Sequence, residues 1–395
     1  MTVADVIEPI SVRVHQILQR DIQPRGKYPV VSQSDNAVEG YTNAEIAITD
    51  VPLVLFGDHT CCLKYIQEPF VVGADGVRLL KSKDGDSEFL YYYLATLIPS
   101  VEDGRYRRHY VSLTDLEINM PPKEVRGKIG YVLSAIDRKI ALNRKRIATL
   151  EAMAKEIYDY WFVQFDFPDA HGRPYKSSGS AMVYDPDLKR EIPKGWEAKS
   201  INDCGAFFRG VGYSKADERA RGTNTVLVMR GNNISNGRIV DDSDRVFIDK
   251  SLVSAEQLMD RFSVLFAMSS GSKEHVGKAA VYYDYPANAA FGAFCSKYVP
   301  RPHYRYMMFC FLVSETYRAF VKRICGGTGI NNMKSEHFDV PLFAVPHDEA
   351  LLHKFNDMAE QAYSQIYNCT QENAKLIGLR DFLLPLLMNG QVKVG

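Results

Sequence analysis

The chain has 395 residues, 48 basic and 48 acidic side chains, and 46% apolar residues. Because domains average roughly 100–200 residues, this length predicts two or three of them. The apolar content excludes a chain that is disordered throughout. The formal net charge of zero excludes a uniformly basic surface, while local basic patches stay compatible with it.

Membrane, secretory and metal-binding classes are also disfavoured. No apolar run reaches the roughly 20 residues of a membrane span, and residues 1–10 lack the basic and apolar regions of a secretory signal. The seven cysteines form no Cys-x-x-Cys pair, which disfavours a zinc ribbon or a disulfide framework. We therefore expect a cytoplasmic protein with no metal, no cofactor and no membrane partner.

The chain begins with a β-rich block that leads into a helix. Short apolar runs separated by Gly, Asn and Asp predict strands at residues 28–31, 46–48, 53–56 and 70–72. An aromatic-rich stretch predicts a helix at residues 89–97. Residues 104–110, which follow it, form the densest basic and aromatic run in the chain.

Residues 123–162 predict one long helix. Apolar residues recur in steps of four and three from Ile129 to Ile157, with one polar member at Asn143. An unbroken period of 3.5 residues favours a coiled coil over a core helix of a bundle. Pro121 and Pro122 stand at the start of the helix, where proline is tolerated.

The same plan then repeats. Residues 166–180 are rich in Pro, Gly and Ser and indicate a linker. An aromatic helix is predicted at residues 306–313. Strands are predicted before it, at residues 225–228, 246–248, 264–266, 279–282 and 297–299.

A second heptad seam follows, from Leu352 to Leu386. It has polar positions near Glu372 and Asn373, and Pro385 should kink or end the helix. Two long helices of matching period are natural partners, and buried polar residues would fix their register. The predicted fold is therefore α+β, with two mixed α/β blocks joined by two long antiparallel coiled-coil helices in a pseudo-twofold internal repeat.

Several segments resemble the specificity subunits of type I restriction–modification systems. They are Trp161-Phe-Val-Gln-Phe-Asp-Phe-Pro168, Arg173-Pro-Tyr-Lys-Ser-Ser-Gly179, Lys189-Arg-Glu-Ile-Pro-Lys-Gly-Trp196, Met229-Arg-Gly-Asn-Asn233 and Gly326-Gly-Thr-Gly-Ile-Asn-Asn-Met-Lys334. The resemblance covers essentially the whole chain. It implies target-recognition domains at residues 1–120 and 194–345, conserved-region helices at 121–165 and 346–395 (the latter with the C-terminal tail), and a linker at 166–193.

The resemblance also implies the function. Such a subunit reads a bipartite sequence in double-stranded DNA, one half per domain, and directs adenine methylation and restriction by its partners. These partners are two methylation (M) subunits and, usually, restriction (R) subunits. The subunit itself is not an enzyme.

A stand-alone DNA methyltransferase or nuclease is the alternative. Phe208-Arg-Gly-Val-Gly212 matches a string that cradles S-adenosylmethionine, but the catalytic motif that should accompany it is missing. Gly271-Ser-Lys-Glu-His-Val-Gly-Lys278 resembles a P-loop with one residue too many between its glycines. Asp169 and Asp187 resemble nuclease carboxylates but lie in a predicted linker.

Four clusters have side chains suited to DNA phosphates or base edges. They are Arg105, Arg107, Arg108 and His109; Arg230, Asn232 and Asn233; Lys273, His275 and Lys278; and Thr328, Asn331, Asn332 and Lys334. Each has a structural alternative. The first would be a charged turn with its tyrosines packed inward, the second an Asx-turn, the third a solvated turn, and the fourth a helix C-cap with a left-handed glycine.

Overall fold

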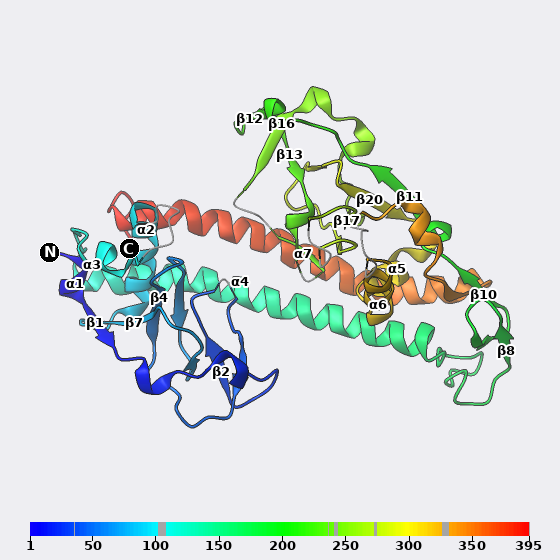
Figure 1. Ribbon diagram of the computed structural model, residues 1–395, viewed down its shortest axis with the longest axis horizontal. Coiled ribbons are helices and arrows are strands. Elements are labelled where there is room, and N and C mark those ends of the chain that lie inside the picture. The colour runs from blue at the N-terminus through cyan, green and yellow to red at the C-terminus, as the bar shows by residue number, and fades with distance from the viewer. Residues whose placement is uncertain are drawn as a thin grey trace. The chain divides into compact units, whose positions relative to one another are not determined.

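The computed structural model describes residues 1–34, 36–101, 108–235, 237–240, 244–271, 275–325 and 332–394. The chain divides into two compact units (Figure 1). The first comprises Met1–Ala141 together with Lys375–Gly395, and the second comprises Leu142–Ala374. Both boundaries fall inside long helices, α4 (Lys123–Tyr158) and α7 (Glu349–Met388).

The first unit has two sheets, and helices pack against the larger one. One antiparallel sheet has the order β1-β7-β4-β5, and a smaller sheet has the order β3-β2-β6 with β2 and β6 parallel. The elements are α1 (Val3–Val6), β1 (Ile7–Ile10), β2 (Tyr28–Val31), β3 (Gly40–Thr42), β4 (Leu53–Gly57), β5 (Leu63–Ile66), β6 (Val71–Val72), β7 (Val77–Ser82), α2 (Ser87–Val101) and α3 (Tyr110–Thr114).

Strand β4 is the centre of this unit. Its sequence Leu-Val-Leu-Phe-Gly is buried at every position, because one face packs toward α2 and the other toward the smaller sheet. A strand covered on both faces shows a continuous apolar run in place of an alternating one.

The second unit contains more strands. They are β8 (Met182–Asp185), β9 (Arg190–Pro193), β10 (Trp196–Lys199), β11 (Gly205–Arg209), β12 (Glu218–Arg219), β13 (Thr225–Met229), β14 (Ile234–Ser235), β15 (Arg238–Ile239), β16 (Val246–Asp249), β17 (Val264–Ala267), β18 (Ala279–Val281), β19 (Ala290–Phe291), β20 (Cys295–Pro300) and β21 (Phe343–Pro346). The helices α5 (Arg305–Leu312) and α6 (Glu315–Cys325) follow β20, and a π-helical turn, Asp159–Val163, extends α4.

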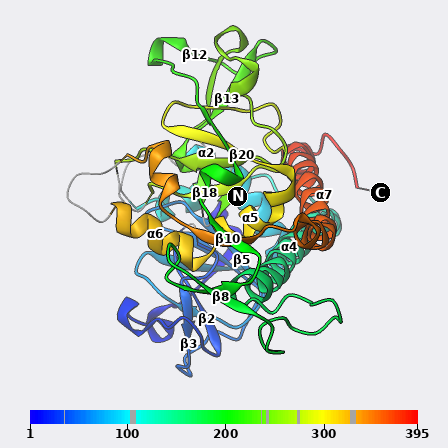
Figure 2. The ribbon, with the colours of Figure 1, turned by 90° about the vertical axis from the view of Figure 1, so that its right-hand side faces the viewer.

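Its two main sheets repeat the connectivity of those of the first unit, with one additional strand, β12, which pairs with β16. The order β11-β20-β17-β18 is antiparallel throughout, like β1-β7-β4-β5. In the other sheet β13 pairs antiparallel with β16 and parallel with β19, as β2 does with β3 and β6. Within this unit, β13 lies on one side of β20, and α5 and α6 lie on the other (Figure 2). Helix α5 is buried on every side, which explains its almost wholly apolar sequence.

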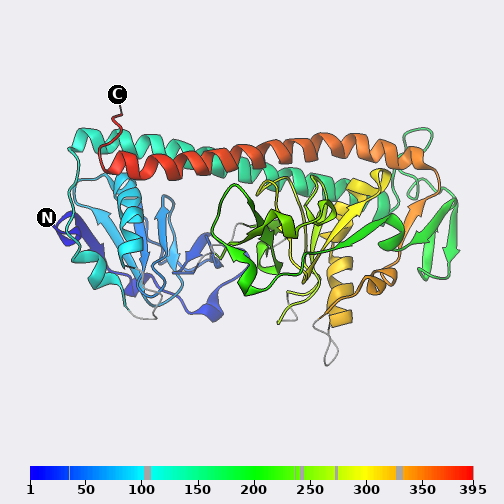
Figure 3. The ribbon, with the colours of Figure 1, turned by 90° about the horizontal axis from the view of Figure 1, so that it is seen from above.

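In each unit a segment of α4 lies beside a segment of α7 that runs in the opposite direction (Figure 3). In the first unit, Arg380 on α7 pairs with Asp137 on α4 at 2.9 Å. In the second unit the amide nitrogen of Asn143 donates to Glu372 at 2.7 Å and to Asn373 at 3.0 Å. The polar positions of the two heptad seams therefore meet.

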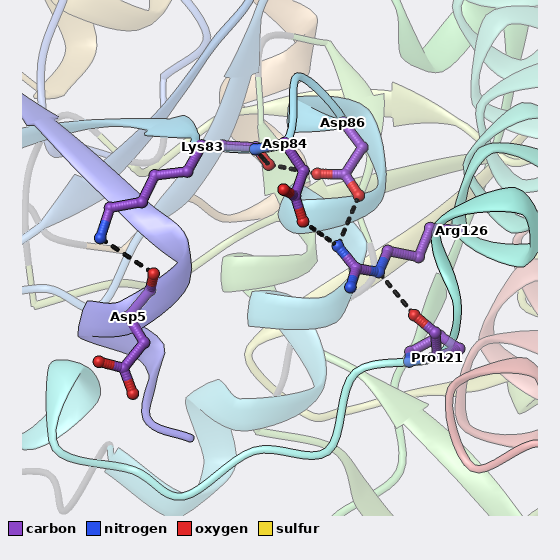
Figure 4. Close-up of polar contacts among 7 residues, drawn as sticks. Asp5, Lys83, Asp84, Asp86, Pro121 and Arg126 are labelled. Carbon is purple, nitrogen blue, oxygen red and sulfur yellow. Dashed lines mark hydrogen bonds and ion pairs between the residues drawn. The ribbon is translucent and has the colours of Figure 1, made fainter.

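Arg126 fixes the start of α4 to the first unit (Figure 4). Its guanidinium nitrogen Nη1 contacts Asp84 at 2.6 Å and Asp86 at 3.2 Å, in the turn before α2. Its Nε donates to the carbonyl oxygen of Pro121 at 2.7 Å. The helix thus begins against the sheet-and-helix layer in a defined orientation.

Most predicted strands and helices are present. Residues 46–48 form no strand, because only Ile48 makes a bridge, to Phe70. The linker predicted at residues 166–193 contains the β8–β9 hairpin. Helix α7 continues to Met388, one turn beyond Pro385. Among the residues that the structure describes, no helix is long and apolar enough to span a bilayer.

Candidate nucleic-acid interface

Three loops that are distant in sequence meet in the second unit. They follow β13, follow β17, and connect β19 with β20. The amide of Gly292 donates to the carbonyl of Met229 at 2.9 Å, and the amides of Met268 and Ser269 donate to the carbonyl of Phe294 at 2.9 and 3.1 Å. Hydrogen bonds between backbones hold this arrangement, so its outward-facing side chains are available for other contacts.

A fourth segment, after α6, joins the same place. The Ser269 hydroxyl donates to the side-chain oxygen of Asn332, and the amide of Met333 donates to the carbonyl of Met268 at 2.6 Å. Asn332 is exposed. Lys334 is also exposed and lies 3.4 Å from Glu336, an ion pair that contributes little at a solvated surface. The structure therefore brings Asn332 and Lys334 next to the loop that follows β17.

The cluster after β13 is largely occupied with its own turn. Arg230 pairs with Asp244 at 2.9 Å. Asn233 is buried, accepts from the amide of Arg230 at 2.9 Å and donates to the carbonyl of Val240 at 3.1 Å. Asn232, between them, is exposed. These are the hydrogen bonds of the turn alternative, and a DNA contact by this cluster stays a prediction.

His275 and Lys278 lie in the loop between β17 and β18. The ammonium of Lys278 donates to Nδ1 of His275 at 2.7 Å. Gly277 has a φ of +74°, and a Cβ there would stand 2.6 Å from the side chain of Val321, so only glycine fits. Its carbonyl also accepts from the Tyr317 hydroxyl at 2.8 Å. The glycine that suggested a P-loop therefore anchors this loop to α6.

In the first unit Asp58, directly after β4, organises the corresponding place. Its carbonyl accepts from the amide of His109 at 2.8 Å, and its carboxylate accepts from the amide of Tyr110 at 2.9 Å. Arg78 pairs with the same carboxylate at 3.0 Å and lies over the Tyr110 ring. The end of the basic loop is thus tied to the end of a central strand.

Electrostatics support this role for Asp58. Burial by itself raises the pKa of the carboxyl group, but the Tyr110 amide and the Arg78 guanidinium outweigh it and hold the pKa below its ordinary value. Asp58 is therefore a buried, charged anchor. Arg108 beside it is exposed, as its predicted contact with DNA requires, whereas His109 is buried and holds the loop through its backbone.

Sequence reasoning missed two residues of this face, Asp58 and Gln33. Gln33 follows β2 and donates to the carbonyl of Asp75 at 2.8 Å, while its side-chain oxygen accepts from the amide of His59 at 3.2 Å. It thereby links the loops after β2, β4 and β6. Of the remaining predicted contact residues, Arg105, Arg107, Lys273, Thr328 and Asn331 lie outside the described residues.

One stretch of the sequence is similar to a known protein family. Residues 3–152 match the type I restriction modification DNA specificity domain. This stretch is therefore similar to a DNA specificity domain, and the chain is similar to the specificity subunits of type I restriction enzymes.

Two such relatives and one solved structure define the extent of the similarity. The MjaIX specificity subunit of Methanocaldococcus jannaschii is 27% identical over 81% of this chain and 72% of its own length. The StySPI specificity subunit of Salmonella potsdam is 32% identical over 44% of this chain, which spans only 38% of that protein. A crystal structure of the S subunit of a type I system from M. genitalium shares the fold, with a TM-score of 0.56, 15% identity, and coverage of 98% of this chain and 95% of that one.

Proposed function

We propose that this chain is the DNA sequence-recognition subunit of a type I restriction–modification complex and reads a bipartite target. The relationship to specificity subunits favours this function over the alternative of a stand-alone methyltransferase or nuclease. In this proposal the chain is not catalytic. It acts in the cytoplasm with two methylation subunits and with restriction subunits that use the same target.

One observation carries the bipartite part of the proposal. Each unit has the same strand connectivity and gathers loops at the end of its central strand, β4 or β17. The loop residues at these ends differ between the units, for example Asp58 in one and Met268 with Ser269 in the other. We infer a pseudo-twofold repeat in which each target-recognition domain (residues 1–120 and 194–345) reads its own half-site.

The helices have a separate role in the proposal. Residues 121–165 and 346–395 form an antiparallel coiled coil that joins the two domains and docks the methylation subunits, while residues 166–193 connect the repeats. Buried Asn143 and Asn373 support a defined register, since polar residues inside an apolar seam exclude shifted pairings.

Mapping of methylated adenines tests the proposal. Cells that carry the chain with its methylation subunits should methylate one bipartite sequence, and deletion of the chain should abolish that methylation. Exchange of residues 1–120 for the matching block of a relative should change one half of the sequence and leave the other. Methylation of DNA by the purified chain alone, or a change in both halves at once, would contradict it.

A further inference from the structure

Phe294 is the most exposed large apolar side chain among the described residues, at 72%. It lies in the short turn between β19 and β20, with buried Phe291 and Cys295 on either side of the turn. A phenyl ring left in water forgoes the favourable free energy of its burial. The chain thus places a large apolar group outward from a well-packed turn.

The backbone of this turn is held on three sides. The Phe294 carbonyl accepts the amides of Met268 and Ser269, the Gly292 amide donates to Met229, and the Cys295 amide donates to Gly292 at 2.8 Å. The ring therefore projects from a rigid support. A rigid support is what a recognition residue requires, because little conformational entropy is lost when it binds.

Gly210 explains why the turn is so close to its neighbours. A Cβ at this position would lie 2.1 Å from the carbonyl oxygen of Gly292 and 2.7 Å from that of Phe291, so no other residue fits. The Val211 amide donates to that Phe291 carbonyl at 2.8 Å. Gly210 of Phe208-Arg-Gly-Val-Gly212, a string that resembles a methyl-donor cradle, thus supports the Phe294 turn.

Several polar residues lie close to the Phe294 turn. The Ser269 amide donates to the Phe294 carbonyl, and the Ser269 hydroxyl donates to the side chain of exposed Asn332. Arg230 follows β13, whose last residue, Met229, accepts a hydrogen bond from the Gly292 amide. A protein-docking site would present a contiguous apolar patch. A single ring among amide and hydroxyl groups suits the major groove of DNA, where hydrogen-bonding groups of the bases lie beside thymine methyl groups.

We propose that Phe294 is a specificity-determining residue that contacts a thymine methyl group in the half-site read by the second unit. This inference rests on the proposed function. The proposal also predicts that the two units read their half-sites with different groups at this position. At the equivalent position of the first unit, the residue whose carbonyl accepts the amide of Asp58 is Gly76, which has no side chain.

The test uses the complete complex with its methylation subunits and duplexes that carry the mapped target. Each thymine of the second half-site is replaced in turn by uracil, which removes only the methyl group. For the natural chain, one replacement should weaken binding roughly fourfold, the factor for one buried methyl group. Phe294→Ala should weaken binding to the natural duplex roughly tenfold and make that replacement silent, whereas Phe294→Leu should keep part of the effect.

Tyr184→Ala is the matched control, because Tyr184 is 62% exposed on the β8–β9 hairpin of the same unit and should not alter binding. Unchanged affinity in Phe294→Ala would overturn the inference, and so would a loss that is coupled to no thymine. Failure of this variant to assemble with methylation subunits in the absence of DNA would assign Phe294 to a protein contact instead. If the natural complex binds no bipartite target, the proposed function itself fails, whatever Phe294 does.

Discussion

Replacement of Asn143 by leucine should destabilise the second unit, although leucine suits a heptad seam better than asparagine. Asn143 and Asn373 are 2% and 8% exposed, so water cannot replace the hydrogen bond between them. The variant leaves the side-chain oxygen of Asn373 buried without its donor, which costs about 1–3 kcal/mol. For a unit of this size, 1 kcal/mol corresponds to about 2–4 °C in melting temperature. We expect a decrease of about 2–12 °C.

Tryptophan fluorescence measures this effect selectively. The only two tryptophans, Trp161 and Trp196, belong to the second unit, so thermal unfolding followed by their emission reports on that unit within the full chain. The control is Arg146→Ala on the same helix. Its guanidinium meets Gln365 at 2.7 Å in an exposed pair, and loss of such a pair should change stability by about 0.5 kcal/mol or less.

A second substitution separates lost hydrogen bonding from altered packing. The double variant Asn143→Leu, Asn373→Leu removes both amides, and an apolar pair of similar shape should restore most of the lost stability. The restored seam is expected to tolerate shifted pairings, because its polar register marker is gone. A single variant as stable as the natural chain, or a double variant no better than the single, would refute the reasoning.

Three further predictions follow from the anchors, the helices and the net charge. Asp58→Asn should weaken recognition of one half-site only, as adenine mapping would reveal. Because the folded pKa of Asp58 lies below its unfolded value near 3.9, the stability it contributes is complete above about pH 4 and is lost as the pH falls further; acid unfolding curves of the variant should lack this contribution. Insertion of four residues after Ala141 and four after Ala374 lengthens each helix by about 6 Å and keeps Asn143 opposite Asn373. It should lengthen the target spacer by one or two base pairs without changing its half-sites. An unchanged spacer would mean that the helices do not set it. With a net charge of zero, the purified chain alone should bind DNA weakly and lose it at moderate salt, and nanomolar specific binding at physiological salt in a titration would contradict this.

The long helices were the most predictable part of the fold. Their heptad pattern is local information, and the polar positions near Asn143, Glu372 and Asn373 could be matched before any contact was known. The strands at residues 28–31, 53–56 and 264–266 were equally visible, because short apolar runs between turn residues are typical of buried strands. The strand orders were not, since pairing between distant segments depends on packing that a single sequence does not encode locally.

The candidate interface was only partly predictable. Charged and amide residues such as Arg108, Asn332 and Lys334 stood out by type. Asp58 and Phe294 did not, because a lone aspartate or phenylalanine most often serves a turn or a core. Gly210 was noticed for its spacing, but its role depends on a carbonyl of Gly292, 82 positions away in the numbering, which only the structure brings near.

Under the proposed function, the two units would carry different recognition surfaces on sheets of similar connectivity. Gly76 has a φ of +79°, and a Cβ there would stand 2.8 Å from both Gln33 and His59, so this position cannot accept the phenyl ring found at Phe294. Replacement of Phe294 by glycine would remove the most exposed large apolar side chain among the described residues of the second unit. The loops that follow β4 and β17 begin at buried strands in equivalent places of their sheets, so each loop can vary in sequence without disturbing its sheet. Under the proposed function, divergence between half-sites would therefore require changes only at strand ends, and the unmatched loop residues of the two units are what this freedom predicts.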